Sequence, residues 1–224
     1  MKVTFDDCND MIHYRIHDFD EKYEKILQMC FYEKVQNGYI KKYPKEAKYL
    51  DKMMKRYSLF AEEMFNQLGY FVEVPWEKGL DSFCSIIEKT DIDWWLAGSC
   101  AACIREINLK PHDIDIMVNS KDISEITEVF KNELIEPIID TNGWFTKDFG
   151  VLFLHCRIDI ASDPSPVLDN PEPVDCGPYA KDHLETIQWR NHQIKIPPLT
   201  LQIAVNKKRG RFDRVEAMES FLEK

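Results

Sequence analysis

The sequence of 224 residues predicts an α/β (α+β) fold, in which a mixed sheet is flanked by helices and preceded by a helical extension. Two observations support this fold class. Apolar residues recur at helical spacing in the first ninety residues. From residue 93 onward, short apolar runs alternate with helical stripes, as they do in folds that pack helices on a sheet. We expect a helical extension at 1–90, a core at 91–197 and a C-terminal helical segment at 198–224.

The extension is predicted from three apolar stripes. The first covers residues 23–31, and the third covers residues 80–87. The second runs from Leu50 to Leu68 and is followed by Gly69, a residue typical of helix C-termini. We expect these helices to act as a cap over the site, as a dimer interface or as a module that binds an acceptor.

In the core, segments with strand character alternate with short helices, and one long segment suits a loop. Residues 162–178 contain five prolines and four acidic residues, so we expect a loop there. Strands are expected at 94–97, 113–118, 135–139, 144–147, 151–161, 184–189 and 193–196, and helices at 99–107, at 122–134 and from Pro198 to the end.

Composition restricts the function classes. The formal net charge of −10 argues against a general affinity for nucleic acid, which depends on Lys and Arg contacts to phosphate. No apolar stretch has the length of a membrane span, and the first residues lack the pattern of a signal peptide. The seven cysteines are odd in number and scattered, which suits reduced thiols. We therefore expect a cytoplasmic protein with no membrane partner.

Acidic residues interrupt two apolar runs. In HDIDIMV, Asp113 and Asp115 would share one face of a strand, because side chains two apart point the same way. Taken alone, this pair is explained most simply by solvated residues on an edge strand. Asp159 in LHCRIDIAS stands opposite Ile158 and Ile160 in the same manner. If the two strands are neighbours, three carboxylates converge, and hard divalent ions such as Mg²⁺ prefer such oxygen ligands.

Gly98 and Ser99 lie between a predicted strand and a predicted helix, with thirteen residues between Ser99 and Asp113. A glycine there lets the backbone approach a ligand, and free amides at the start of a helix attract phosphate. Simple N-capping also accounts for Ser99.

The series of strand, Gly-Ser, helix, DxD strand and a single later Asp resembles the DNA polymerase β-like nucleotidyltransferase superfamily. The similarity is closest to small bacterial enzymes that modify antibiotics at hydroxyls, the aminoglycoside and lincosamide nucleotidyltransferases. It covers roughly Trp94 to Ala161 and, more loosely, the tail from Pro198, where a Lys on a helix is followed by a Gly-Arg step. The first ninety residues lie outside it.

The resemblance implies a role for each group. Asp113, Asp115 and Asp159 would hold two Mg²⁺ ions, and Asp159 could also act as general base. Gly98 and Ser99 would contact the triphosphate of an NTP. The nucleoside monophosphate would pass to a hydroxyl of a small molecule or a protein, and pyrophosphate would leave.

The basic segment KKRGRFDR offers two more candidates for the triphosphate. Lys207 and Arg211 could reach its oxygens, and an Arg can grip them in a bidentate manner. A solvated helix end explains the same segment equally well.

Two other functions remain open at this stage. One is a binding or antitoxin-like partner of the same fold that binds nucleotide without catalysis, and a homodimer is possible. The other is a DxD glycosyltransferase, which leaves Gly98, Ser99 and Asp159 unexplained and which the helical stripes before the motif disfavour.

Overall fold

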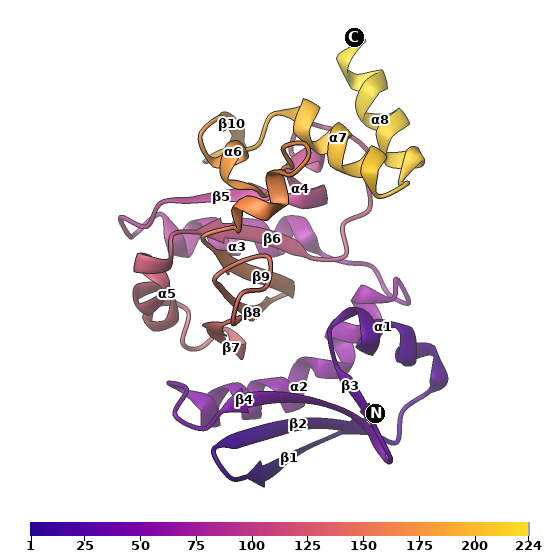
Figure 1. The fold of residues 1–224 in the computed structure, drawn as a ribbon, viewed down its shortest axis with the longest axis vertical. Helices are drawn as coiled ribbons and strands as arrows, with labels where there is room; N and C mark the ends of the chain where they lie inside the picture. Colours follow the sequence, from indigo (N-terminus) through magenta and orange to yellow (C-terminus); the bar gives the residue numbers. More distant parts are fainter. Residues whose placement is uncertain (224) are drawn as a thin grey trace.

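The computed structural model describes residues 1–223, and Figure 1 shows their arrangement. A four-stranded N-terminal sheet lies at one end and the two C-terminal helices lie at the other. Between them is a five-stranded sheet that positions the predicted site residues.

The N-terminal sheet contradicts the prediction of a mainly helical extension. Its strands run antiparallel in the order β1-β2-β4-β3. In β2 the buried residues Ile12, Tyr14 and Ile16 alternate with polar ones, a period-two pattern that favours a strand. The strands are β1 (Lys2–Cys8), β2 (Met11–His17), β3 (Glu33–Val35) and β4 (Gly38–Pro44), and η1 (Glu21–Tyr23) with α1 (Glu24–Met29) joins β2 to β3.

All three predicted helical stripes of the first ninety residues are present. The stripe at 23–31 forms η1 and α1, and the other two are α2 (Leu50–Leu68), with Gly69 at its C-cap, and α3 (Trp76–Ile87). The buried face of α2 packs against the N-terminal sheet and also against β7 (Leu134–Asp140) of the central sheet. This helix therefore joins the N-terminal sheet to the core.

The central sheet is mixed, as predicted. Its order is β5-β6-β9-β8-β7, with β6 and β9 parallel and the other neighbours antiparallel. The strand expected at 151–161 is two strands, because the chain turns at His155, whose φ is +64°. The strand expected at 144–147 is absent apart from a bridge between Thr146 and Pro164. The bounds are β5 (Trp94–Ala97), β6 (Ile114–Val118), β8 (Asp148–Leu154) and β9 (Cys156–Ser162).

The remaining elements follow the predicted order. The helix expected at 99–107 is α4 (Gly98–Cys103), and the one expected at 122–134 is shorter, α5 (Ile123–Val129) after η2 (Ser120–Asp122). The proline-rich segment is mostly loop. The others are η3 (Pro166–Asp169), α6 (Pro178–Lys181), β10 (Glu185–Trp189), β11 (His192–Ile196), α7 (Leu199–Lys208) and α8 (Phe212–Leu222).

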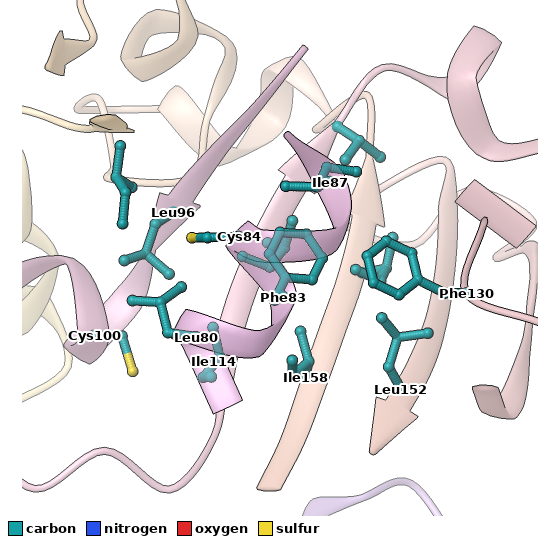
Figure 2. Close-up of a cluster of buried hydrophobic side chains, with 14 of the residues drawn as sticks. Leu80, Phe83, Cys84, Ile87, Leu96, Cys100, Ile114, Phe130, Leu152 and Ile158 are labelled. Atoms are coloured by element: carbon teal, nitrogen blue, oxygen red, sulfur yellow. The ribbon is translucent and has the colours of Figure 1, made fainter. Parts of the chain in front are cut away.

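The two faces of the central sheet differ. On one face, α3 and α5 cover an apolar core, and Figure 2 shows Leu80, Phe83 and Ile87 of α3 above Ile114 and Ile158 of the sheet. On the other face, α2 packs against β7 and β8 and also contacts β9. Farther along that face, Trp95 and Met117 pack with Cys176 and Leu184, and the candidate site lies between these two covered regions. Within residues 1–223, no helix has the length and apolar character needed to cross a membrane.

Candidate active site

A cavity of about 490 Å³ opens over β5, β6 and β9 on the face that α2 covers only in part. Six of the seven predicted site residues line it, and Lys207 does not. The six are Gly98, Ser99, Asp113, Asp115, Asp159 and Arg211.

The predicted neighbourhood of the carboxylates is present. Asp115 pairs in register with Asp159, because β6 and β9 are adjacent and parallel. The neighbouring Ile114, Ile116 and Ile158 point into the core on the other face, so the aspartates point into the cavity. Two segments more than forty residues apart thus bring their acidic side chains to one place.

Gly98 forms the corner between β5 and α4. Its φ is +64°, a conformation that favours glycine, and a Cβ at this position would overlap Oδ2 of Asp115. The backbone therefore approaches the carboxylate as closely as only glycine permits. Ser99 is buried beside it at the second position of α4, whose N-cap is Ala97, so N-capping does not explain this serine.

Within residues 1–223, the Asp113 and Asp115 side chains have no ion-pair partner, although arginines line the same cavity. Burial raises the pKa of Asp113, although Arg157 and other arginines act against it. Burial and then the nearby Asp113 and Asp159 raise the pKa of Asp115 well above its usual value. This pair is electrostatically short of a cation.

Asp159 differs from the other two, because Arg157 holds it. Nε and Nη2 of Arg157 donate to its two oxygens at 2.6 and 3.2 Å. Burial raises the pKa of Asp159 to about 6, while the charge of Arg157 acts in the opposite direction. A carboxylate with a pKa near the working pH suits a general base.

The cavity wall opposite the carboxylates is basic. Arg209, Arg211 and Arg214 lie at the junction of α7 and α8 and line the cavity. None of the three forms an ion pair within residues 1–223. Partial burial and then the charges of its two arginine neighbours lower the pKa of Arg211. Three crowded cations without carboxylate partners form a site suited to a polyanion.

Lys207 is placed outside the cavity, contrary to the prediction that it reaches a triphosphate. It is exposed and forms an ion pair of 2.6 Å with Glu219 of α8. The last turn of α7 directs this lysine along α8, whereas the residues after the turn at Gly210 face the cavity.

Sequence reasoning missed Arg209, Arg214, Arg157, Asn206 and Asp175. The basic segment KKRGRFDR, which is visible in the sequence, could have indicated Arg209 and Arg214. Asp175 comes from the proline-rich loop and lies near the Gly98 amide, which acts against the burial that raises the pKa of Asp175. Nothing in the sequence pattern indicates that proximity, which places a carboxylate at the corner expected to bind phosphate.

The donors in the cavity fit a hard divalent cation by their chemistry, because carboxylate oxygens without a cationic partner are the ligands that Mg²⁺ prefers. In the described residues, however, no group of three or more His, Cys, Asp or Glu side chains is arranged to hold a metal ion. Arg157 occupies the third carboxylate, so Asp113 and Asp115 are the pair available. The three-carboxylate site stays a prediction.

Comparison with known proteins bears on the fold. No protein-family model and no curated protein matches this chain. Among solved structures, it is similar to a protein of Thermotoga maritima provisionally named a nucleotidyltransferase, with a TM-score of 0.50 and 18% sequence identity. The match covers 68% of this chain and 96% of that one. The chain has a nucleotidyltransferase-like fold.

A second similarity is weaker. It is to a lincomycin-bound structure of the lincosamide antibiotic adenylyltransferase LnuA, with a TM-score of 0.47 and 13% identity, over 65% of this chain and 97% of that one. It is too distant to bear on the substrate. Since the Thermotoga maritima protein is covered almost completely, about a third of this chain lies outside the fold that the two share.

Proposed function

We propose that this protein is a Mg²⁺-dependent nucleotidyltransferase that transfers a nucleoside monophosphate from an NTP to a hydroxyl of a small molecule or a protein. The observation that supports it most is the cavity itself. It combines carboxylates without a cationic partner on its floor with three unpaired arginines on its wall. A divalent cation bound with a triphosphate would satisfy both sets of charges at once.

The cation and the triphosphate would bind on the α4 side. Asp113 and Asp115 would hold magnesium, which would neutralise them and stabilise charge on the phosphates as pyrophosphate leaves. Arg209, Arg211 and Arg214 would bind the β- and γ-phosphates. Withdrawal of Asp175 would open the Gly98 amide to a phosphate oxygen.

The transfer step requires an acceptor on the side of Asp159. The acceptor hydroxyl oxygen attacks the α-phosphorus, and the bond from that phosphorus to the bridging oxygen of pyrophosphate breaks in line. Asp159 accepts the hydroxyl proton, and Arg157 keeps the carboxylate oriented.

Transfer of label tests the proposal. The protein is incubated with each α-³²P-labelled NTP, Mg²⁺ and a panel of hydroxylated antibiotics, glycosides and cellular proteins. We expect labelled acceptor with at least one NTP, no transfer in EDTA and none in Asp115→Asn. The exposed Asp51→Asn serves as a matched control that keeps wild-type activity. Equal labelling by Asp115→Asn contradicts the assigned role.

A nucleotide-binding protein without catalysis is the second candidate. It is favoured by the ion pair in which Arg157 holds Asp159, and by the position of the Asp175 carboxylate near the Gly98 amide. Saturable magnesium-dependent NTP binding, with no transfer to water or to any acceptor, is its expected result.

A further inference from the structure

A second cavity of about 390 Å³ adjoins the first. Phe31, Trp144 and Phe149 line both cavities, so these aromatic side chains form the wall between them. We call these three residues the aromatic wall. The second cavity extends from the wall between the N-terminal sheet and the β7–β8 hairpin, and β4 contributes Lys41 and Tyr43 to it.

The aromatic wall is exposed although it is apolar. Phe31 is 63% exposed and Trp144 is 38% exposed, and their rings contact edge to face with centroids 5.0 Å apart. Trp144 makes a similar contact with Phe149 at 5.8 Å. Phe145 and Met29, which line the first cavity, are each about half exposed. Large apolar side chains gathered at a cavity mouth indicate a binding surface.

The chain holds these side chains in place at some cost in stability. Phe31 follows α1 and has a φ of +63°, a left-handed conformation that is strained for a bulky residue. Trp144 lies in the β7–β8 turn, where its amide donates to Oγ1 of Thr141 at 3.2 Å. The Asn142 amide donates to Oδ1 of Asp140 at 2.6 Å, so the turn has a defined shape.

The wall lies on the Asp159 side of the first cavity. Phe149 on β8 pairs with Ala161, which is two residues after Asp159 on the same face of β9. The arginines and Gly98 lie toward β5 and α4, on the far side of Asp115. A ligand against the aromatic wall therefore lies beside the proposed base, opposite the proposed triphosphate site.

Of the charged side chains that line the second cavity within residues 1–223, the two lysines are paired with carboxylates, and Asp140 forms no ion pair but is exposed, so water screens its charge. Nζ of Lys41 lies 2.6 Å from Oε2 of the buried Glu136. Lys42 is paired with Glu33 at 2.7 Å. A ligand with a strong charge of either sign would leave one of these pairs, or itself, without compensation. The cavity favours a neutral group.

From this geometry we propose that the aromatic wall and the second cavity form the acceptor subsite. The acceptor would be a neutral hydroxyl compound with an aryl or similarly flat apolar group, which lies against Phe31 and Trp144. That the ligand is an acceptor rests on the proposed function. That the cavity binds such a ligand does not depend on it. It assigns a role in substrate selection to Phe31, which lies before β3 in the N-terminal region.

Matched probes test this inference. Each pair consists of a 4-nitrophenyl glycoside and the methyl glycoside of the same sugar, which share their sugar hydroxyls and differ in the aryl group. Binding to the full-length protein is measured by saturation-transfer difference NMR and calorimetry. We expect the aryl member to bind at least tenfold more tightly, and Trp144→Ala to lose roughly tenfold of that affinity. Phe71→Ala, an exposed aromatic outside both cavities, should keep it.

The outcomes separate the inference from the proposed function. Equal binding of both members of each pair, or loss of aryl binding in Phe71→Ala to the same extent, overturns the subsite. So does a Trp144→Ala protein that binds NTP less tightly and aryl glycosides as before, because the wall then stacks a nucleobase. Aryl-selective binding without any transfer supports the subsite as a ligand site while the proposed activity fails. Transfer that is equal for both members supports the activity and overturns the subsite.

Discussion

Two buried charge clusters lie on the same face of the central sheet and behave in opposite ways. At the junction with the N-terminal sheet, Glu136 pairs with Lys41 and accepts a hydrogen bond from Tyr32 at 3.2 Å. Burial would raise the pKa of Glu136, but Lys41 and Arg157 outweigh it and hold that pKa below its usual value. In the cavity, Asp113 and Asp115 have raised pKa values and no ion pair within residues 1–223.

This difference in pairing distinguishes buried charges that support the fold from buried charges that bind a ligand. A buried charge with its partner in the chain serves the fold, because removing one member leaves the other uncompensated. A buried charge without a partner costs stability and persists where a ligand supplies the compensation. On this basis we expect the loss of one member of the junction cluster to destabilise the protein, and we propose that the cavity cluster binds a cation. Each prediction below tests one side of that contrast.

The largest expected effect is on activity. Asp115→Asn should lower the rate of nucleotide transfer by roughly a thousandfold, since it removes one of two available ligands for the cation. The same variant should be at least as stable as the wild type without divalent ions, because it removes a repelling carboxylate. Transfer rates and urea denaturation of Asp115→Asn and of the control Asp51→Asn measure both quantities. A marked loss of stability would place Asp115 in the scaffold.

Glu136→Gln should show the reverse pattern. It leaves Lys41 without its buried partner, so we expect the free energy of unfolding to fall by about 3 kcal/mol. Magnesium-dependent NTP binding should be unchanged at temperatures where the variant is folded. Denaturant unfolding is compared with that of Glu125→Gln, an exposed substitution on α5 that should be neutral. Equal stability of the two variants would show that the junction pair contributes nothing.

The pH dependence of stability should reveal the three buried carboxylates of the cavity, Asp113, Asp115 and Asp159. Their pKa values are raised in the folded protein, so the folded state binds more protons than the unfolded state between about pH 4 and about 6, the value for Asp159. Without divalent ions, the contribution of these groups to stability should therefore fall as the pH rises through this window. Saturating Mg²⁺ should remove the fall. Urea denaturation series at several pH values, with and without Mg²⁺ and with Asp115→Asn as reference, would measure it.

The smallest expected effect concerns Phe31 of the aromatic wall. Phe31→Gly should raise the free energy of unfolding by about 1 kcal/mol, because glycine adopts a φ of +63° without strain and the exposed ring contributes little packing. Phe71→Gly, at an aromatic of ordinary backbone conformation, should instead be neutral or destabilising. Thermal unfolding distinguishes the two. Destabilisation by Phe31→Gly would show that this residue belongs to the scaffold.

Much of the central sheet could be predicted from the sequence, because its signals are local. The alternation around Asp115 and Asp159 gave the face of each side chain, and the positions of Gly98 and Ser99 gave the corner. The sequence did not predict that the strands of Asp115 and Asp159 are neighbours. Their pairing is a long-range contact, and periodicity does not specify such contacts.

The missed features depend on contacts that span the chain. The sheet at 2–44 was not predicted, because the helical spacing in residues 23–87 dominates the pattern of this region. Ile12, Tyr14 and Ile16 nevertheless alternate with polar residues, as they do in a strand. The pairing of Arg157 with Asp159 was visible as two residues on one strand face. The proximity of Asp175 to Gly98 could not be predicted from the sequence, because the conformation of a proline-rich loop has no periodic signal.

The most direct test of the account is a calorimetric titration with the non-hydrolysable analogue α,β-methylene-ATP, or the matching analogue of the preferred NTP, in Mg²⁺ and in EDTA. The account predicts binding that needs Mg²⁺ in the wild type, loses that dependence in Asp115→Asn, weakens at least tenfold in Arg211→Ala and is unchanged in Asp51→Asn. Equal affinity in Mg²⁺ and EDTA for the wild type, or no binding of any analogue, would contradict it.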